Sequence, residues 1–238
     1  MDTDTLPTHQ TRRREQLLKG SLAMVPLSIA VIPWGLLAGS FAIDAGLTSL
    51  ESQALSAILF AGSAQLVATG MFKAGAALAT MLLTTFFITS RHLLYSVSMR
   101  NRISPLPLKW RLTLGFLLTD ELFAICGQQS EQQFDRWYAL GAGLSFYLCW
   151  NLATLAGIVL GNQIPMMNEL GLEFAVAATF IAIVVPNIQS SPVIVAVLTS
   201  LLVSVTCHYF SIDGGLMLAS ISGMLAGYVT EQMKGRAA

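Results

Sequence analysis

The sequence predicts an all-α fold, a polytopic bundle of membrane helices, and three observations support this. Of the 238 residues, 54% are hydrophobic and only 11% are charged, whereas soluble domains carry about 25% charged residues. The apolar residues form continuous runs, not the short alternating strands of a membrane β-barrel. Several runs approach the roughly 20 residues that a helix needs to cross the hydrocarbon core.

The apolar runs divide the chain into segments, from which we expect about seven or eight hydrophobic helices, one or more of them broken or re-entrant. The segments are 20–43, 52–72, 74–99, 110–128, 138–160, 172–186, 192–209 and 214–231. Polar stretches containing glycine or proline separate most of them. Residues 1–15 are expected to form a flexible cytoplasmic tail and residues 16–238 a single transmembrane domain, with no cleaved signal peptide.

A faint internal repeat relates two of these segments. The stretch Leu37–Gly39 resembles Leu155–Gly157, and Trp34 and Trp150 lie at similar distances before these two stretches. Transporters often contain weak internal repeats, with the binding site at the repeat interface. Chance similarity between two apolar segments explains the resemblance equally well.

Basic residues near the segment ends predict the orientation, because such residues stay on the cytoplasmic side. They are Arg12, Arg13, Arg14, Lys19, Arg100, Arg102, Lys109, Arg111, Lys234 and Arg236. They place both termini and the loop 100–111 in the cytoplasm of a bacterium, with the chain in the inner membrane. Three full crossings cannot return the loop 100–111 to that side. One of the first three segments must therefore fail to cross, and 52–72 is the candidate because its middle is small and polar.

That middle reads Ala61-Gly62-Ser63-Ala64-Gln65. If the helix breaks here, its free N–H groups favour a carboxylate, and Gln65 supplies both a donor and an acceptor. In the first segment, Pro33 frees a backbone carbonyl that can bind an ammonium group or a water. Close helix–helix packing is the alternative explanation for both features.

Arg91 and His92 follow a stretch that has carried no charge since Lys73. Histidine titrates near neutral pH, as a proton-coupled transporter requires. An arginine near a membrane boundary can also simply extend to the headgroups. Both interpretations of Arg91 stay open at this point.

Two adjacent carboxylates, Asp120 and Glu121, lie well inside the apolar segment 110–128. Ionisable groups at such depth are costly and usually face a cavity or a partner. We expect them to pair with Arg91, to bind a substrate ammonium group or to take up a proton. If the segment is short and re-entrant, they merely reach water.

The remaining composition gives no indication of other ligands. The net charge is zero, so no nucleic-acid partner is expected. No cofactor or metal is expected either, because Cys126, Cys149 and Cys207 lack metal-ligand spacing.

Three motifs, taken together and in order, resemble the AzlC/YgaZ family. They are Phe60–Gln65 (FAGSAQ), Ser90–Tyr95 (SRHLLY) and Leu118–Phe123 (LTDELF). The likeness extends from about Arg14 to the C-terminus, and the first segment with its two prolines also fits. One position departs from the family, which often has Asn or Asp two residues before the arginine, where this chain has Thr89.

The resemblance implies the large subunit of a branched-chain amino-acid exporter for valine, leucine, isoleucine and sometimes methionine. It also implies proton antiport and a partner, a small hydrophobic membrane subunit resembling AzlD/YgaH. The charged and polar residues named above match the two charges of a zwitterionic substrate. Arg91 or the 61–65 stretch suits its carboxylate, and Asp120 or Glu121 suits its ammonium group. Aromatic residues suit its apolar tail: Phe60, Phe86, Phe87 and Phe123.

Two other functions are compatible with a membrane bundle. An intramembrane hydrolase would use Ser63 as nucleophile with His92 or His208 as base, although no sequence feature ties these residues together. A passive channel, or a subunit that only scaffolds a partner, is the second. Adjacent carboxylates inside an apolar segment are hard to reconcile with a passive scaffold.

Overall fold

The computed structural model describes residues 9–127, 129–161, 181, 185, 188–210, 212 and 215–237. Every regular element in this part of the chain is a helix, which confirms the predicted class. Three of the described helices are long and apolar enough to cross a membrane: Arg12–Asp44, Arg136–Gly161 and Ser191–Tyr209. The expected segment 172–186 lies almost entirely outside the described residues, so the count of segments stays a prediction.

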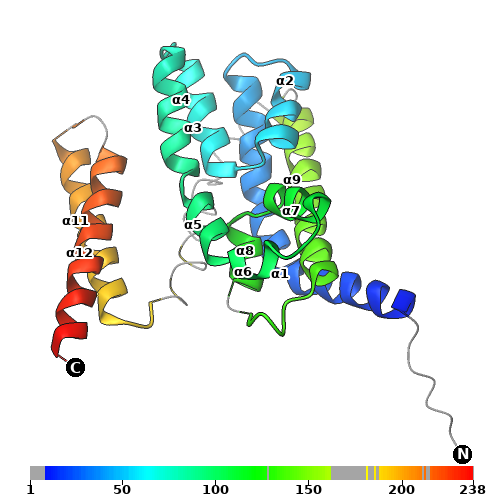
Figure 1. Ribbon diagram of the computed structural model, residues 1–238. Coiled ribbons are helices and arrows are strands. Elements are labelled where there is room, and N and C mark those ends of the chain that lie inside the picture. Colours follow the sequence, from blue (N-terminus) through cyan, green and yellow to red (C-terminus); the bar gives the residue numbers. More distant parts are fainter. Residues whose placement is uncertain are drawn as a thin grey trace, which may run out of the picture. The chain divides into compact units, whose positions relative to one another are not determined.

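The described helices are α1 (His9–Asp44), α2 (Ser49–Ala54), the π-helix η1 (Leu55–Leu59), α3 (Gly62–Lys73), α4 (Leu78–Thr89), α5 (Arg91–Ser98), α6 (Arg100–Ile103), α7 (Leu108–Phe116), α8 (Asp120–Cys126), α9 (Arg136–Gly161), α11 (Ser191–Tyr209) and α12 (Gly215–Ala237) (Figure 1). The chain divides into two compact units, residues 1–179 and 180–238. The expected single domain over 16–238 therefore stays a prediction. Helix α1 begins at His9, within the stretch expected to be a flexible tail.

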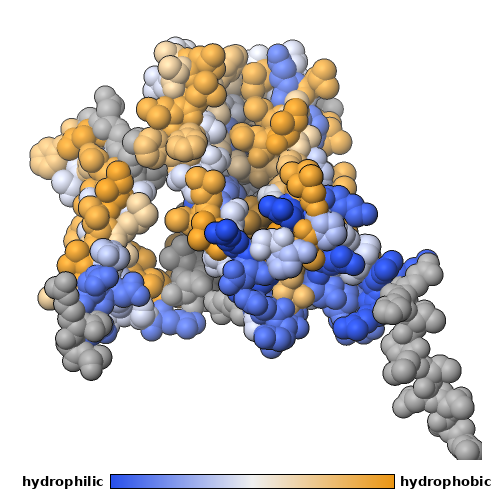
Figure 2. Space-filling view, in the orientation of Figure 1, coloured by the Kyte–Doolittle hydropathy of each residue, from blue (hydrophilic) through white to orange (hydrophobic). Residues whose placement is uncertain are grey.

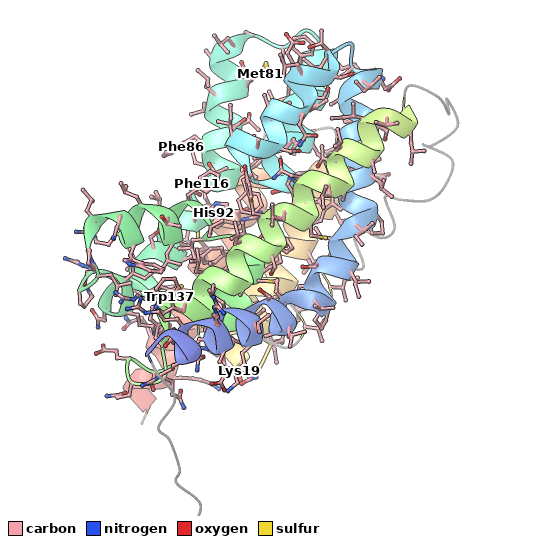
Figure 3. The ribbon with its side chains drawn as sticks, turned by 90° about the vertical axis from the view of Figure 1, so that its right-hand side faces the viewer. Lys19, Met81, Phe86, His92, Phe116 and Trp137 are labelled. Carbon is pink, nitrogen blue, oxygen red and sulfur yellow. The ribbon has the colours of Figure 1, made fainter. Side chains whose placement is uncertain are left out.

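Helices α1 and α9 lie side by side and form the core of the first unit (Figures 1 and 3). Gly20 of α1 lies against Ala142 of α9, and Gly39 lies against Gly157. Since the residue numbers rise together, the two helices run parallel. Glycine at these contacts lets the two backbones approach closely, as in many membrane helix pairs.

The two stretches that suggested a repeat lie at the same level of this helix pair. Gly39 and Gly157 belong to them, and the Trp34 and Trp150 rings meet edge to face with centroids 6.4 Å apart. The repeat itself stays a prediction, because residues 162–180 lie outside the described part of the chain.

The segment 52–72 is broken in its middle, as predicted. Phe60 adopts a left-handed conformation (φ 44°, ψ 42°) and Ala61 is extended, so the helix ends after η1 and α3 begins at Gly62. A left-handed residue other than glycine costs about 1–3 kcal/mol and persists only when its surroundings hold it. The Phe60 ring does pack against Tyr147 and Phe116, with centroids 4.9 and 5.8 Å away.

Residues 49–73, which we call the first hairpin, enter and leave at the same end of the first unit. Its tip, Phe60, contacts Phe146 and Tyr147 near the middle of α9. Its last residue, Lys73, forms a 2.5 Å salt bridge with Asp44 at the end of α1. The chain has therefore turned back at the break, as a re-entrant segment does.

Residues 108–126, the second hairpin, enter from the opposite end. Trp110 of α7 packs against Trp137 at the start of α9, with ring centroids 4.7 Å apart, and Phe116 reaches Tyr147. After the break at residues 117–119 the chain turns back, because Leu117 and Leu122 both contact Gly143. The tips of the two hairpins meet where Phe60 stacks on Phe116.

Helices α4 and α5 connect the two hairpins and meet at Ser90, where the helical hydrogen bonding changes. These helices lead to the basic loop 100–111, whose Trp110 packs on Trp137 at the start of α9, the residue that Arg13 also contacts. The loop 100–111 and the start of α1 thus lie at the same end of the first unit, as expected if the segment 52–72 does not cross, while the side of the membrane stays a prediction. In Figure 2 the first unit is apolar over α3 and α4 and hydrophilic near α6 and the start of α7.

The second unit is an antiparallel helix pair in its described residues. Gly223 of α12 lies against Ser200 of α11, and Gly227 lies against Ala196. The Ser200 hydroxyl donates to the Ala219 carbonyl at 3.1 Å. Many apolar side chains of both helices are exposed, including Leu201, Leu202 and Leu225, as expected of helices that face lipid or a partner.

Candidate functional site

The three chain breaks of the first unit surround one small cavity, which we call the central chamber. It is lined by Val31 and Trp34 of α1, Phe60, Ala61, Gly62 and Ser63 of the first hairpin, Arg91 and His92 of α5, Thr119, Asp120 and Glu121 of the second hairpin, and Phe146 and Trp150 of α9. Its volume is about 30 Å³, enough for a water or two. Pockets that bind small molecules span about 300–1,000 Å³, so in this conformation the chamber is closed to a ligand of that size.

Arg91 links the two hairpins across the chamber. Its Nη2 lies 2.8 Å from Asp120 Oδ2 in a salt bridge and donates to Ser63 Oγ at 2.9 Å. The guanidinium therefore binds the second hairpin by charge and the first by a neutral hydrogen bond. The expected pairing of Arg91 with a carboxylate of 120–121 is confirmed, and it involves Asp120.

Asp120 is held on its other side by Tyr95. The phenol donates to Asp120 Oδ1 at 2.7 Å, and the Tyr95 ring stacks on Phe123 with centroids 4.4 Å apart. Asp120 also occupies the first position of α8, whose N-cap Thr119 accepts from the Leu122 amide. A negative charge is favourable at that end of a helix. The Asp120 carboxylate is thus fixed in orientation by two side chains.

Glu121 faces the same chamber, and its carboxylate is hydrogen-bonded by the Thr119 side chain and by its own backbone amide. Only 7% of the residue is exposed, and it forms no salt bridge within the described ranges. Burying an ionised carboxylate without a counter-charge is costly, so such groups tend to bind a proton or a cation. The two adjacent carboxylates therefore differ in their surroundings.

His92 lies at the edge of the chamber, midway along the first unit (Figure 3). Its Nδ1 lies 2.9 Å from the Thr89 carbonyl, and its ring meets Tyr95 edge to face at 5.8 Å. His92 is placed next to the Tyr95–Asp120 pair and does not contact Ser63 by any hydrogen bond between described atoms.

The start of α3 faces the chamber with its first backbone N–H groups. No side chain caps this helix, and the first amides of a helix have no partner within it. The Trp150 ring covers Gly62 so closely that an added Cβ there would lie 2.8 Å from the indole. Glycine is therefore required for this approach. The expected anion-binding feature at residues 61–65 has the right position, at the chamber wall.

Gln65 and Pro33 lie outside the chamber lining. The Gln65 amide is fully buried and donates from Nε2 to Ser56 Oγ at 2.9 Å, and the Ser56 hydroxyl also lies 2.9 Å from Thr154 Oγ1. This network joins both arms of the first hairpin to α9. The structure thus shows Gln65 in a contact that stabilises the fold, and its expected substrate contact stays a prediction.

An apolar cavity of about 370 Å³ adjoins the chamber and shares Phe60, Ala61 and His92 with it. Its other walls include Phe86, Leu93 and Phe116. Two of the expected tail-binding residues, Phe60 and Phe86, line it. Phe123 instead stacks on Tyr95. Phe116 has no local sequence signal for this site, because only the meeting of the two hairpins brings it there.

Comparison with known proteins places the chain among membrane proteins. The family model described as "AzlC protein" matches residues 26–164, the part that holds all three breaks. The chain is 30% identical over 222 residues to the inner membrane protein YgaZ of Escherichia coli (strain K12), covering 89% of each protein. It is 25% identical over 189 residues to the branched-chain amino acid transport protein AzlC of Bacillus subtilis (strain 168), covering 77% of this chain and 73% of that protein.

An uncharacterized membrane protein of Archaeoglobus fulgidus is 25% identical over 224 residues, which cover 92% of this chain and 98% of the relative. No solved structure shows a significant match to the chain. The relatives match over most of their length, and the three motifs noted in the sequence lie within the matched region 26–164.

Proposed function

The chain belongs to the AzlC family, and from this premise we propose that it exports branched-chain amino acids by proton antiport. The substrates are valine, leucine and isoleucine, with methionine as a further one. In this proposal the chain is the large subunit, sits in the bacterial inner membrane with a cytoplasmic N-terminus, and works with a small membrane partner resembling AzlD/YgaH. The name of the Bacillus subtilis relative supports the substrate class.

One observation carries the transport proposal: two opposed re-entrant hairpins place a cation and two carboxylates around a closed chamber. Broken helices at mid-membrane are a common construction of binding sites in secondary transporters. The carboxylate of an amino acid suits Arg91 and the free amides at the start of α3. Its ammonium group suits the two carboxylates at the tip of the second hairpin.

The apolar cavity beside the chamber suits the tail of the substrate. It shares Phe60 with the chamber and continues along Phe86 and Phe116. A pocket of this kind distinguishes aliphatic side chains only weakly, because one methylene is worth about 1–3 kcal/mol. This agrees with a transporter that accepts several branched-chain amino acids.

The closed chamber must widen before it can hold an amino acid, and Arg91 is the contact that keeps it closed. The guanidinium joins Ser63 and Asp120, one from each hairpin. A substrate carboxylate that binds Arg91 competes with Asp120 for it. Substrate binding would then separate the two tips and change which end of the chamber is open.

We assign different roles to the two carboxylates in this cycle. Asp120 is a positioning residue, because Arg91 and Tyr95 already fix it. Glu121 carries the proton, because it is buried at the chamber without a salt bridge in the described structure. Its charge changes when the chamber opens to one side or the other, which couples proton movement to substrate movement.

The test is valine efflux from proteoliposomes that contain the chain together with its small partner. Glu121→Gln keeps the shape of the side chain and removes the proton site. We expect it to lose efflux driven by a pH gradient by about tenfold or more, which corresponds to 1.4 kcal/mol or more, and to retain exchange of valine for valine. Glu131→Gln, at an exposed residue, is the matched control.

Efflux driven by pH that persists in Glu121→Gln contradicts the role of Glu121. Wild-type flux that follows the valine gradient with no response to pH supports the passive channel and rejects antiport. Flux that is absent with the chain and its partner together rejects the transport proposal as a whole. Labelling of Ser63 by a fluorophosphonate would support the hydrolase; in the described residues of the first unit the Ser63 hydroxyl accepts from Arg91, and no hydrogen bond joins it to His92.

A further inference from the structure

A second cluster of charged and aromatic residues lies far from the chamber, where α1, α7 and α9 begin. The Arg136 guanidinium lies 5.0 Å from the Trp110 ring centroid and 5.9 Å from that of Trp137. The Arg13 guanidinium lies 5.4 Å from the Trp137 centroid. We call these four residues the basic–aromatic cluster, and Figure 3 shows Trp137 at this end of α9. Cations over indole faces are held in place while their N–H groups stay available to a ligand.

The cluster lines a cavity of about 470 Å³ together with Lys109, Thr113 and Leu140. This volume is within the range of about 300–1,000 Å³ that is typical of pockets for small ligands. A smaller cavity of about 200 Å³ continues it to Arg12 and Asp135. The structure thus provides a hollow at the junction of three helices, with cations in its walls.

The positive charge at this cavity is not balanced by carboxylates. Arg12, Arg13, Lys109 and Arg136 line the two cavities against a single acidic residue, Asp135. The Asp135 carboxylate already accepts from the amides of residues 137 and 138, at 2.7 and 3.2 Å, where it caps α9. No carboxylate in the described ranges forms a salt bridge with any of the four cations. The cavity therefore attracts an anion.

An exposed apolar track leads away from the cavity along α9. Leu140 lies in the cavity wall, and Leu144, Leu148 and Leu152 follow at four-residue spacing, 43%, 52% and 66% exposed. Residues four apart share one face of a helix. The track runs from the basic end of the first unit toward its apolar middle, the direction in which an acyl chain enters a bilayer.

We propose that this cavity binds the headgroup of an anionic phospholipid, with its acyl chains along Leu144 and Leu148. A free phosphate would use the cations but not the apolar track. Tryptophans at such a position are typical of the membrane–water interface, and basic pockets between helices on the cytoplasmic side bind anionic headgroups. This proposal does not rest on the transport function, since it concerns another end of the molecule.

The first test measures thermal unfolding of the purified full-length chain in detergent with added phosphatidylglycerol, phosphatidylcholine or inorganic phosphate. We expect phosphatidylglycerol alone to raise the midpoint. In Lys109→Gln/Arg136→Gln the concentration needed for half the effect rises about 25-fold, at roughly one factor of five per cation. Arg111→Gln removes a charge from the same helix outside this cavity and leaves the effect unchanged.

Stabilisation that is equal in the double variant and the wild type overturns the proposal. Stabilisation by phosphatidylcholine that equals the stabilisation by phosphatidylglycerol also overturns it. Stabilisation by inorganic phosphate that equals the stabilisation by phosphatidylglycerol shows a simple anion site without a lipid.

A second test uses the wild-type chain alone and so does not depend on how the variants fold. Phosphatidylglycerol brominated on its acyl chains should quench tryptophan fluorescence at a lower mole fraction than brominated phosphatidylcholine. Trp34 and Trp150 are only 4% and 2% exposed, so the quenching reports on Trp110 and Trp137. Unlabelled phosphatidylglycerol should restore the fluorescence and unlabelled phosphatidylcholine should not. Equal quenching by the two brominated lipids rejects the site.

Discussion

The two re-entrant hairpins reach the same chamber from opposite ends, and they differ in charge. The tip of the first hairpin, residues 60–63, is neutral and presents backbone amides and the Ser63 hydroxyl. The tip of the second hairpin carries Asp120 and Glu121. Arg91, between them, is the cation they share. One tip is therefore suited to the negative end of a zwitterion and the other to its positive end.

The hairpins also differ in what holds them in place. The first is fixed by buried hydrogen bonds that join Ser56, Gln65 and Thr154, and by the Lys73–Asp44 salt bridge at its base. The second is held at its tip by the ion pair of Asp120 and by aromatic contacts. A change of charge in the chamber acts directly on the second hairpin and only through Arg91 on the first. The acidic second hairpin is therefore the one expected to move.

The largest effect is expected in the labelling of the hairpin ends, because the two hairpins should begin on opposite faces of the membrane. In a chain without its three native cysteines, Ser49→Cys and Ala74→Cys mark the two ends of the first hairpin. A membrane-impermeant maleimide added to intact cells should label both. Asn101→Cys, before the second hairpin, should react only after permeabilisation. If Ser49→Cys and Ala74→Cys react from opposite sides, residues 49–73 cross the membrane and do not form a re-entrant hairpin.

The next largest effect is expected at the tip of the second hairpin. Asp120→Asn leaves Arg91 without its counter-charge, which costs about 3–5 kcal/mol for a fully buried pair and about 2–3 kcal/mol here, because the Arg91 side chain is 29% exposed. The unfolding midpoint should fall by roughly 5–10 °C. The double variant Arg91→Gln/Asp120→Asn should recover part of this loss. A midpoint unchanged in Asp120→Asn would show that the ion pair does not hold the hairpin.

A smaller effect is expected within the first hairpin. Gln65→Leu removes the amide that bonds Ser56 in a fully buried site, at a cost of about 1–2 kcal/mol. Unfolding should shift while the substrate concentration for half-maximal efflux stays the same, because Gln65 does not line the chamber. Thr69→Val is the matched control: the buried Thr69 hydroxyl has no partner among the described residues, so its loss should be neutral. A changed half-maximal concentration would return Gln65 to the binding site.

The smallest effect tests the neutral contact between the two hairpins. Ser63→Ala removes one hydrogen bond from Arg91 while the ion pair remains, which is worth about 0.5–1 kcal/mol, a change of a few-fold in half-maximal valine concentration. Ser145→Ala is the control, because the Ser145 hydroxyl donates to the Ala142 carbonyl of its own helix and lines neither the chamber nor the apolar cavity. Equal responses of the two variants would remove Ser63 from the site.

Local sequence was sufficient for much of the fold. The composition predicted membrane helices, and the small residues at 61–65 predicted the break, which lies at Phe60 and Ala61. The depth of Asp120 within an apolar segment predicted a pairing with Arg91, which the structure confirms. These properties depend on short stretches of chain, where hydrophobicity and backbone preferences decide the outcome.

Only the tertiary structure determined which residue within each motif forms which contact. Adjacent residues on a helix point about 100° apart, so the rotation of α8 against α5 determines that Asp120, and not Glu121, meets Arg91. In the same way the packing of α3 on α9 turns Gln65 away from the chamber. The basic–aromatic cluster joins residues 13, 110 and 136–137 from three remote segments. The sequence fixes which groups exist, while contacts between distant helices set the directions in which they point.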